Sequence, residues 1–172
     1  MAHLAVDCGV DGLVVSNTTN DRFDGKALPA AAGGVVAGST IDMGGGGRDG
    51  GGSEAQQWVQ PSLKSKDAGE RGGLSGAPVK GKALATLRDM YQLTGGRVPL
   101  VGVGGISSGA DAYERIRAGA SLVQVYTALA YEGPGLARRI NDDLAVLLAK
   151  DGFTSVADAV GVDNPIRPQT KK

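Results

Sequence analysis

Two short apolar segments in the second half of the chain, each followed by small or polar residues, restrict the fold more than any other feature. The first, residues 98–109, reads VPLVGVGGISSG, and the second, residues 117–129, reads RAGASLVQVYTAL. This pattern predicts two strands separated by a helix that begins near residues 107–111. A strand, a helix and a second strand in this order form a parallel βαβ unit that is buried on both faces.

The residues that follow these two predicted strands indicate a site for a phosphate group. Gly104 and Gly105 follow the first strand, and the missing side chains let backbone N–H groups approach an anion closely. Tyr126 and Thr127 follow the second strand, where further N–H groups can face the same anion. Such a site is typical of the last part of a (β/α)8 barrel. Paired glycines after a strand also make an ordinary tight turn, and this alternative stays open.

The same alternation of strands and helices extends along the rest of the chain. Residues 13–16 form an apolar strand that ends in the polar cluster SNTT, after the tail of a helix. Leu84 and Leu87 share one face of a helix that Gly95 ends. Further helices are predicted over residues 109–118, 134–150 and 155–160. The first is expected to bury Ala112 and Ile116, and the second to carry an apolar stripe of Leu136, Ile140, Leu144, Leu147 and Leu148.

Three strands that alternate with helices predict an α/β fold with a parallel sheet. Doubly wound and barrel folds are both built from such units. Because polar and glycine clusters follow each strand, the pattern favours a TIM barrel with its chemistry at the carboxyl ends of the strands. A closed barrel of this kind has eight strands. We therefore expect the chain to be the C-terminal part of such a barrel, about three βα units.

A glycine-rich segment interrupts this pattern. Residues 33–52 read GGVVAGSTIDMGGGGRDGGG, and a segment of this composition buries too little apolar surface to offset its backbone entropy. We expect residues 24–71 to be a disordered low-complexity insertion, and residues 1–23 and 72–172 to form the partial barrel domain. The alternative is a nucleotide-binding glycine loop, but the segment lacks the Lys-Ser/Thr ending and the flanking strand and helix of such a loop.

Charge and composition narrow the classes of function. The 18 basic and 18 acidic residues cancel, so no overall field favours nucleic acid or an anionic membrane. One cysteine and one histidine cannot assemble a zinc site, and no metal site is predicted. No apolar run reaches the roughly 20 residues of a membrane span, and because the first residues show neither a signal-peptide pattern nor a basic amphipathic leader, no targeting segment is expected in this sequence. We expect Cys8 to be a small packing residue, and Tyr91 and Tyr131 to be packing aromatics.

Three stretches outside the glycine-rich segment resemble the C-terminal part of the dihydroorotate dehydrogenase family. The first is GVDGLVVSNTT at residues 9–19, the second runs from GGLSG to YEGPGL over residues 72–136, and the third is DGFTSVADAVG at residues 151–161. Within the family, VQVYTALAYEGP and FTSVADAVG are similar to the membrane-associated class that uses a quinone. The resemblance implies FMN-dependent oxidation of dihydroorotate to orotate in pyrimidine biosynthesis, with a quinone reoxidising the flavin at the mitochondrial inner membrane.

Carried onto this sequence, the resemblance assigns ligand contacts to the polar residues after the first strand. Asn17 and Thr18 would hydrogen-bond the orotate carboxylate and ring amides, and Ser16 would lie beside the flavin. Ser75 and Gly76 in the GGLSG loop would line the FMN. Without the resemblance, the asparagine and threonines of SNTT form an ordinary Asx or Ser/Thr turn, which is the alternative.

The resemblance also assigns the FMN phosphate to the two loops described first. It would be held, largely by backbone N–H groups, by Gly104, Gly105, Tyr126 and Thr127. The protein then contributes orientation and electrostatics, since the flavin itself accepts the hydride.

Parts of the family pattern lie upstream of the residues in this chain. They include the general base, which is a serine in the quinone-using class, the lysine that contacts the flavin, and the N-terminal region that contacts the membrane. No catalytic residue is therefore assigned here, and we expect the chain to be a fragment that forms no orotate by itself, because general base catalysis needs a positioned group. The alternative function is a non-catalytic FMN- or phosphate-binding remnant of the same fold. A different phosphate-binding barrel enzyme would match GGLSG and SNTT only by chance.

Overall fold

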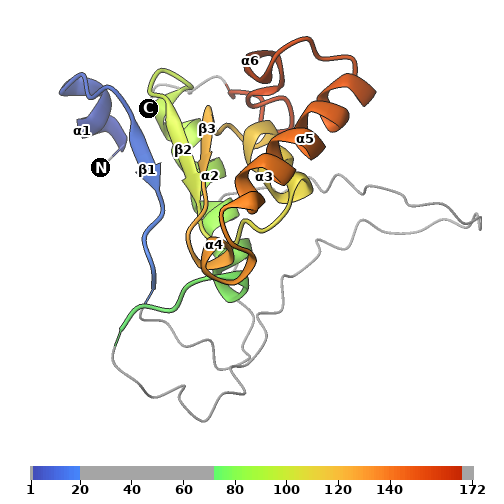
Figure 1. Cartoon of the computed structure of the whole chain (residues 1–172). Coiled ribbons are helices and arrows are strands. Elements are labelled where there is room, and N and C mark those ends of the chain that lie inside the picture. The colour runs from blue at the N-terminus through green and yellow to red at the C-terminus, as the bar shows by residue number, and fades with distance from the viewer. Residues whose placement is uncertain (1, 20–71, 168–172) are drawn as a thin grey trace, which may run out of the picture.

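A parallel three-stranded sheet forms the centre of the fold, with its strands in the order β1-β2-β3 (Figure 1). The computed structural model describes residues 2–19 and 72–167. Along the chain the elements are α1 (Ala2–Asp7), β1 (Leu13–Val15), the 3-10 helix η1 (Ala77–Val79), α2 (Lys80–Thr94), β2 (Leu100–Val103), α3 (Gly109–Arg117), β3 (Leu122–Gln124), α4 (Thr127–Glu132), α5 (Gly135–Lys150) and α6 (Val156–Ala159). The α/β class predicted from the sequence is confirmed, with all three expected strands present.

The register of the sheet brings three connecting segments to one edge. Leu13 pairs with Leu100 between β1 and β2, and Val103 pairs with Gln124 between β2 and β3. Both pairings are parallel, so all three strands end on the same side of the sheet. The residues that follow β1, β2 and β3 therefore meet beyond these carboxyl ends, where ligands bind in open α/β sheets and barrels alike.

Three clusters of buried apolar side chains hold the helices against the sheet. One cluster joins β1, α2 and β2, the second joins α3, α5 and α6, and the third joins α3 and α5 beside the end of β3. Their most buried members include Leu84, Leu87, Leu100, Ala112, Ile116, Leu136 and Ile140. Full burial of a leucine side chain contributes about 2 kcal/mol. The predicted apolar faces of α2, α3 and α5 are confirmed.

Helix α2 ends as the sequence predicts. Gly95 adopts the left-handed conformation with φ 61°, and its N–H donates to the carbonyl of Gln92. A residue without a side chain adopts this conformation at no steric cost, which is why glycine stops helices at this position. Tyr91, one turn earlier, packs against the first apolar cluster, so its predicted packing role is confirmed.

Two other packing predictions are wrong. Cys8 is exposed, because α1 ends at Asp7 and the cysteine falls in the turn that follows, so it does not continue the buried face of Ala2 and Ala5. Tyr131 is 86% exposed. It lies on α4, a helix that was not predicted and that buries none of its residues, so no apolar periodicity marks it in the sequence.

A cluster of ion pairs, which we call the C-terminal clasp, joins α3 to the segments around α6. It consists of Tyr113, Arg117, Asp151 and Asp163. Two guanidinium nitrogens of Arg117 donate to the two carboxylate oxygens of Asp163 at 2.7 and 2.6 Å, and a third donates to Asp151 at 2.7 Å. Bidentate pairs of this kind are among the stronger polar contacts in proteins.

The predicted glycine-rich insertion, residues 24–71, lies outside the described residues. Thr19 and Leu74, on either side of this part of the sequence, pair as an antiparallel bridge with N···O distances of 3.2 and 2.7 Å. The backbone segments at Thr19 and Leu74 therefore lie side by side, although they are far apart in the sequence. Within the two described ranges, no helix has the length and apolar character needed to cross a membrane.

Candidate functional site

A cavity of ≈ 640 Å³ opens at the carboxyl ends of the three strands. Its walls come from the segments after β1, β2 and β3 and from the loop that precedes α2. Small-molecule and cofactor sites have volumes of about 300–1,000 Å³. The cavity is therefore large enough for a ligand of cofactor size.

Every residue that the sequence analysis assigned to ligand binding lines this cavity. They are Ser16, Asn17, Thr18, Ser75, Gly76, Gly104, Gly105, Tyr126 and Thr127. The structure brings them together from four segments that lie far apart in the sequence. Their individual contacts with substrate or cofactor stay predictions.

The paired glycines after β2 have a structural role that the sequence did not reveal. Gly104 and Gly105 have φ values of 114° and 72°, in the region that side chains disfavour. A Cβ on Gly105 would lie 2.6 Å from the Cβ and 2.8 Å from the Cα of Lys80, and one on Gly104 would lie 2.9 Å from the Cβ of Ala83. Both glycines therefore let the first turn of α2 pack directly on the β2–α3 loop, whether or not a ligand is bound.

Several backbone N–H groups that border the cavity make no backbone hydrogen bond to the described residues. In the described part of the chain, the N–H groups of Gly104, Gly105, Tyr126 and Thr127 donate no backbone hydrogen bond. Two of these groups follow β2 and two follow β3, so donors from both loops border one space. Successive free N–H groups of this kind form concavities that bind anions.

Several polar side chains that line the cavity also make hydrogen bonds to other residues of the protein. The Oδ1 of Asn17 accepts a hydrogen bond from the backbone N–H of Thr18 at 2.8 Å, so the local turn that was the alternative to ligand contact is present. This bond uses one lone pair and leaves the two amide N–H donors of Asn17 available. Across the cavity, the hydroxyl of Thr127 donates to the hydroxyl oxygen of Ser75 at 3.1 Å and ties the two loops together.

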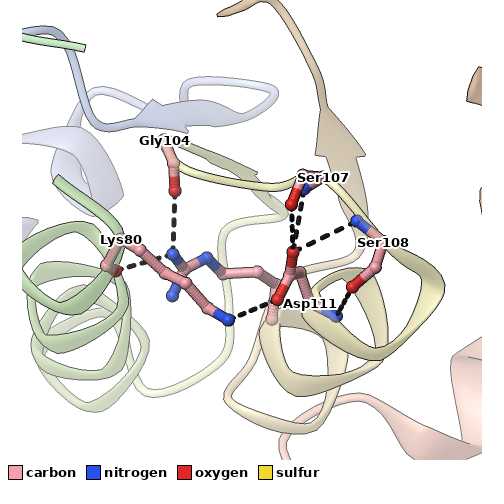
Figure 2. A network of polar contacts seen from close by, with 6 residues as sticks. Lys80, Gly104, Ser107, Ser108 and Asp111 are labelled. Atoms are coloured by element: carbon pink, nitrogen blue, oxygen red, sulfur yellow. Dashed lines mark hydrogen bonds and ion pairs between the residues drawn. The ribbon is translucent and has the colours of Figure 1, made fainter. Parts of the chain in front are cut away.

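A buried carboxylate fixes the loop between β2 and α3 (Figure 2). Asp111 accepts hydrogen bonds from the backbone N–H of Ser107 at 2.8 Å, from its hydroxyl at 3.0 Å and from the N–H of Ser108 at 3.1 Å, and it forms an ion pair with Lys80. Burial raises the pKa of Asp111, but the hydrogen bonds and charge of Lys80 and the bonds from Ser107 outweigh it and hold the pKa below its ordinary value. Asp111 was not predicted from the sequence, although Ser108 and Asp111 have the spacing of a helix capping box.

A buried arginine fixes the other end of the same loop. One guanidinium nitrogen of Arg115 donates to the carbonyl of Gly104 at 2.9 Å and to that of Lys80 at 2.7 Å. The residue is 1% exposed, and burial lowers its pKa. Arg115 was also missed, because its partners lie on other elements and no local spacing reveals them.

A scan against protein-family models matches residues 55–148, more than half of the chain, to the family described as dihydroorotate dehydrogenase. The chain belongs to the dihydroorotate dehydrogenase family. Of the predicted site residues, Ser16, Asn17 and Thr18 precede the matched range and the other six fall inside it. The cavity is thus built largely from the matched part of this dihydroorotate dehydrogenase family member.

Individual relatives carry the same family name. The chain is 48% identical over 163 residues to a dihydroorotate dehydrogenase (quinone) of Parvibaculum lavamentivorans, an alignment that covers 95% of this chain and 36% of that protein. It is 60% identical over 103 residues to that of Rhodospirillum rubrum, covering 60% of this chain and 28% of that protein. A crystal structure of ligand-free type DHODH from Eimeria tenella matches with a TM-score of 0.70 and 38% identity, covering 94% of this chain and 34% of that chain. The chain spans about a third of the length of these dihydroorotate dehydrogenases.

Proposed function

We propose that this chain forms the flavin-phosphate and orotate-binding part of an FMN-dependent dihydroorotate dehydrogenase that uses a quinone as its electron acceptor. The reaction would oxidise dihydroorotate to orotate in pyrimidine biosynthesis. One observation carries the proposal: all the residues assigned to FMN and orotate from the sequence line a single cavity at the carboxyl ends of the strands. The family match and the relatives named dihydroorotate dehydrogenase (quinone) support it.

The donors around the cavity fit the phosphate of FMN. The N–H groups of Gly104 and Gly105 would bind it from the β2–α3 loop, and those of Tyr126 and Thr127 from the β3–α4 loop. These N–H groups make no backbone hydrogen bond in the described part of the chain, and at both glycines no side chain stands between the backbone and a ligand. When bound, FMN supplies the acceptor for the hydride.

The polar residues after β1 fit the substrate. Asn17 keeps two amide donors, and with the hydroxyl of Thr18 it offers the hydrogen-bonding groups that a carboxylate and ring amides need. Ser16 would lie beside the flavin, with Ser75 and Gly76 lining its other side. The hydrogen bond from Thr127 to Ser75 would hold the phosphate-binding loop and the flavin-lining loop at a fixed separation.

The sheet is proposed to be part of a (β/α)8 barrel. Within the described residues, the outer edges of β1 and β3 have no strand beside them. Val14 is 62% exposed and Leu122 is 66% exposed, which is unusual for strands of a parallel sheet and is expected where further strands would pack. Residues 24–71 are proposed as an insertion into this barrel. A location at the mitochondrial inner membrane follows from the family resemblance alone, and the relatives include bacterial proteins.

The test is a titration of the 172-residue chain with FMN, followed by an assay of orotate formation from dihydroorotate and a quinone. We expect FMN to bind and no orotate to form, because the general base of the family lies upstream of the stretches that match. Failure to bind FMN would contradict the proposed cofactor site. Orotate formation by this chain alone would show that it contains a complete catalytic apparatus and would overturn the assignment of no catalytic residue.

The second candidate is a non-catalytic FMN- or phosphate-binding remnant of the same fold. The observation that favours it is the set of backbone N–H groups after β2 and β3 that make no backbone hydrogen bond in the described residues, because such donors bind an anion without any catalytic group. The intact mass of the endogenous protein separates the two candidates. A mass well above that of 172 residues supports a complete flavoenzyme, whereas a mass equal to it, with FMN bound and no turnover, supports the remnant.

A further inference from the structure

Arg115 is the most deeply buried charged residue in the described part of the chain, and it lies next to the cavity without lining it. Its side chain is 1% exposed, and it is absent from the residues that line the cavity. One of the two carbonyls that it contacts belongs to Gly104, which lines the cavity from the β2–α3 loop, and the other belongs to Lys80 in the first turn of α2. Figure 2 draws these two hydrogen bonds as dashed lines that start at the labelled Gly104 and Lys80 oxygens.

The contact with Gly104 sets the direction of a donor in the cavity wall. A trans peptide is planar, so the C=O of one residue and the N–H of the next point in opposite directions. The peptide between Gly104 and Gly105 is trans. Because the Gly104 carbonyl points to Arg115, the N–H of Gly105 points away from Arg115, and that N–H makes no backbone hydrogen bond in the described residues.

The charge of Arg115 is also left without a direct counterion. Among the described residues it forms no salt bridge, whereas the neighbouring ammonium of Lys80 is paired with Asp111. The Nε and Nη1 atoms of Arg115 have no hydrogen-bond partner there. Burying this cation is costly; the carboxylates of Glu114 and Asp111 offset part of the cost through space, and an anion held in the cavity would offset more.

We propose that Arg115 is a positioning residue for the flavin phosphate. It would hold the Gly104–Gly105 peptide so that the Gly105 N–H faces the phosphate, and it would place a positive charge beneath that anion. It touches neither flavin nor substrate and acts through the loop. This inference rests on the proposed function of the cavity.

The experiment compares the affinities of FMN and riboflavin, which differ only in the phosphate. In the full 172-residue chain, Arg115→Met keeps an unbranched apolar stem but removes the charge and both hydrogen bonds. We expect its FMN affinity to fall about tenfold while its riboflavin affinity changes less than about twofold, because only the phosphate depends on Arg115. Arg115→Lys keeps the charge and is expected to lose about threefold in FMN affinity alone.

Arg117→Met is the matched control. It makes the same change two residues later on α3, but its guanidinium belongs to the C-terminal clasp and makes no contact with the cavity loops. The ratio of FMN to riboflavin affinity should stay at the wild-type value in this variant. If Arg115→Met does not fold, the ratio of FMN to riboflavin affinity in Arg115→Lys tests the positioning role, since this variant is expected to lose FMN affinity alone.

The outcomes separate this inference from the proposed function. The positioning role is contradicted if the wild-type preference for FMN over riboflavin is unchanged in the Arg115 variants. It is also contradicted if this preference falls equally in Arg117→Met. Neither result contradicts the FMN site itself. A wild-type chain that binds FMN no more tightly than riboflavin contradicts the phosphate site itself. Loss of the preference in the Arg115 variants alone supports both.

Discussion

The loops around the cavity and the C-terminal clasp differ in how completely their polar groups are paired. In the clasp, Arg117 is bonded through all three nitrogens to Asp163, Asp151 and Tyr113. Around the cavity, backbone donors after β2 and β3 make no backbone hydrogen bond in the described residues. Both regions adjoin α3, so one helix separates a region whose polar groups stabilise the fold from one whose donors are free for a ligand. The comparison predicts that substitutions in the clasp change stability alone, whereas those in the loops also change binding.

Replacing Gly105 should have the largest effect, because the β2–α3 loop both packs against α2 and offers N–H donors to the cavity. Gly105→Ala places a Cβ 2.6 Å from a side-chain carbon and 2.8 Å from a backbone carbon of Lys80, at a φ of 72°. We expect the free energy of unfolding to fall by about 3 kcal/mol, measured by urea denaturation, and FMN binding to be lost.

Gly152→Ala is the control for the effect of φ alone. Gly152 has a φ of 79°, and a Cβ there would meet no atom within 4 Å. This variant should lose only about 1 kcal/mol and should bind FMN normally. Equal losses in the two variants would show that backbone conformation, and not the close approach of α2, sets the requirement for glycine.

Arg117→Met breaks the clasp and should have the next largest effect. The side chains of Arg117 and Asp163 are each 22% exposed, so solvent screens the pair only in part. We expect a loss of about 1.5 kcal/mol in thermal or urea unfolding with no change in flavin affinity. If the affinity for FMN changed while that for riboflavin stayed constant, the clasp would be coupled to the phosphate site, which would contradict the expectation that clasp substitutions change stability alone.

Asp111→Asn should give an effect that depends on pH. The pKa of Asp111 is held below its ordinary value of 3.8, so its ionised form stabilises the fold at any pH above that value. This contribution is lost as the pH falls through the lower pKa of the folded state. We expect the variant to be about 1 kcal/mol less stable at neutral pH and the difference to disappear as the pH falls through the lowered pKa of Asp111, measured by urea unfolding from neutral to acid pH. A difference that persists at low pH would assign the effect to packing and not to charge.

Thr127→Val should have the smallest effect. It removes the hydrogen bond to Ser75 between the two loops and keeps the shape of the side chain. A loss of about 0.5–1 kcal/mol is expected in unfolding, because one partly buried hydroxyl bond is broken. Flavin affinity should fall slightly, since the backbone N–H of this residue is retained; a complete loss of FMN binding would mean that the hydroxyl itself binds the phosphate.

Much of the fold and of the site could be predicted because the signals are local. Apolar spacing predicted the faces of α2 and α5, and Gly95 predicted the end of α2. The candidate site residues all follow strands or precede a helix, where turn-forming and polar residues stand out in a sequence. Their meeting around one cavity follows from parallel strands that end on one side of the sheet.

The parts that sequence reasoning missed depend on contacts between distant segments. Arg115 bonds the carbonyl of a residue 35 positions earlier, and Asp111 pairs with Lys80 31 positions earlier, so no periodicity reveals either. Helix α4 has no buried face and leaves no apolar pattern. The clash that requires Gly105 arises from α2, which a reading of the β2–α3 loop alone cannot show.

The most direct test of the central claim is an NMR titration of the ¹⁵N-labelled chain with FMN, followed through the backbone amide signals. The phosphate site predicts that the largest shifts occur at the amides of Gly104, Gly105, Tyr126 and Thr127, that riboflavin leaves these four nearly unmoved, and that the clasp residues do not respond. Shifts that are absent, or that centre elsewhere in the described part of the chain, would contradict a phosphate site at the carboxyl ends of β2 and β3.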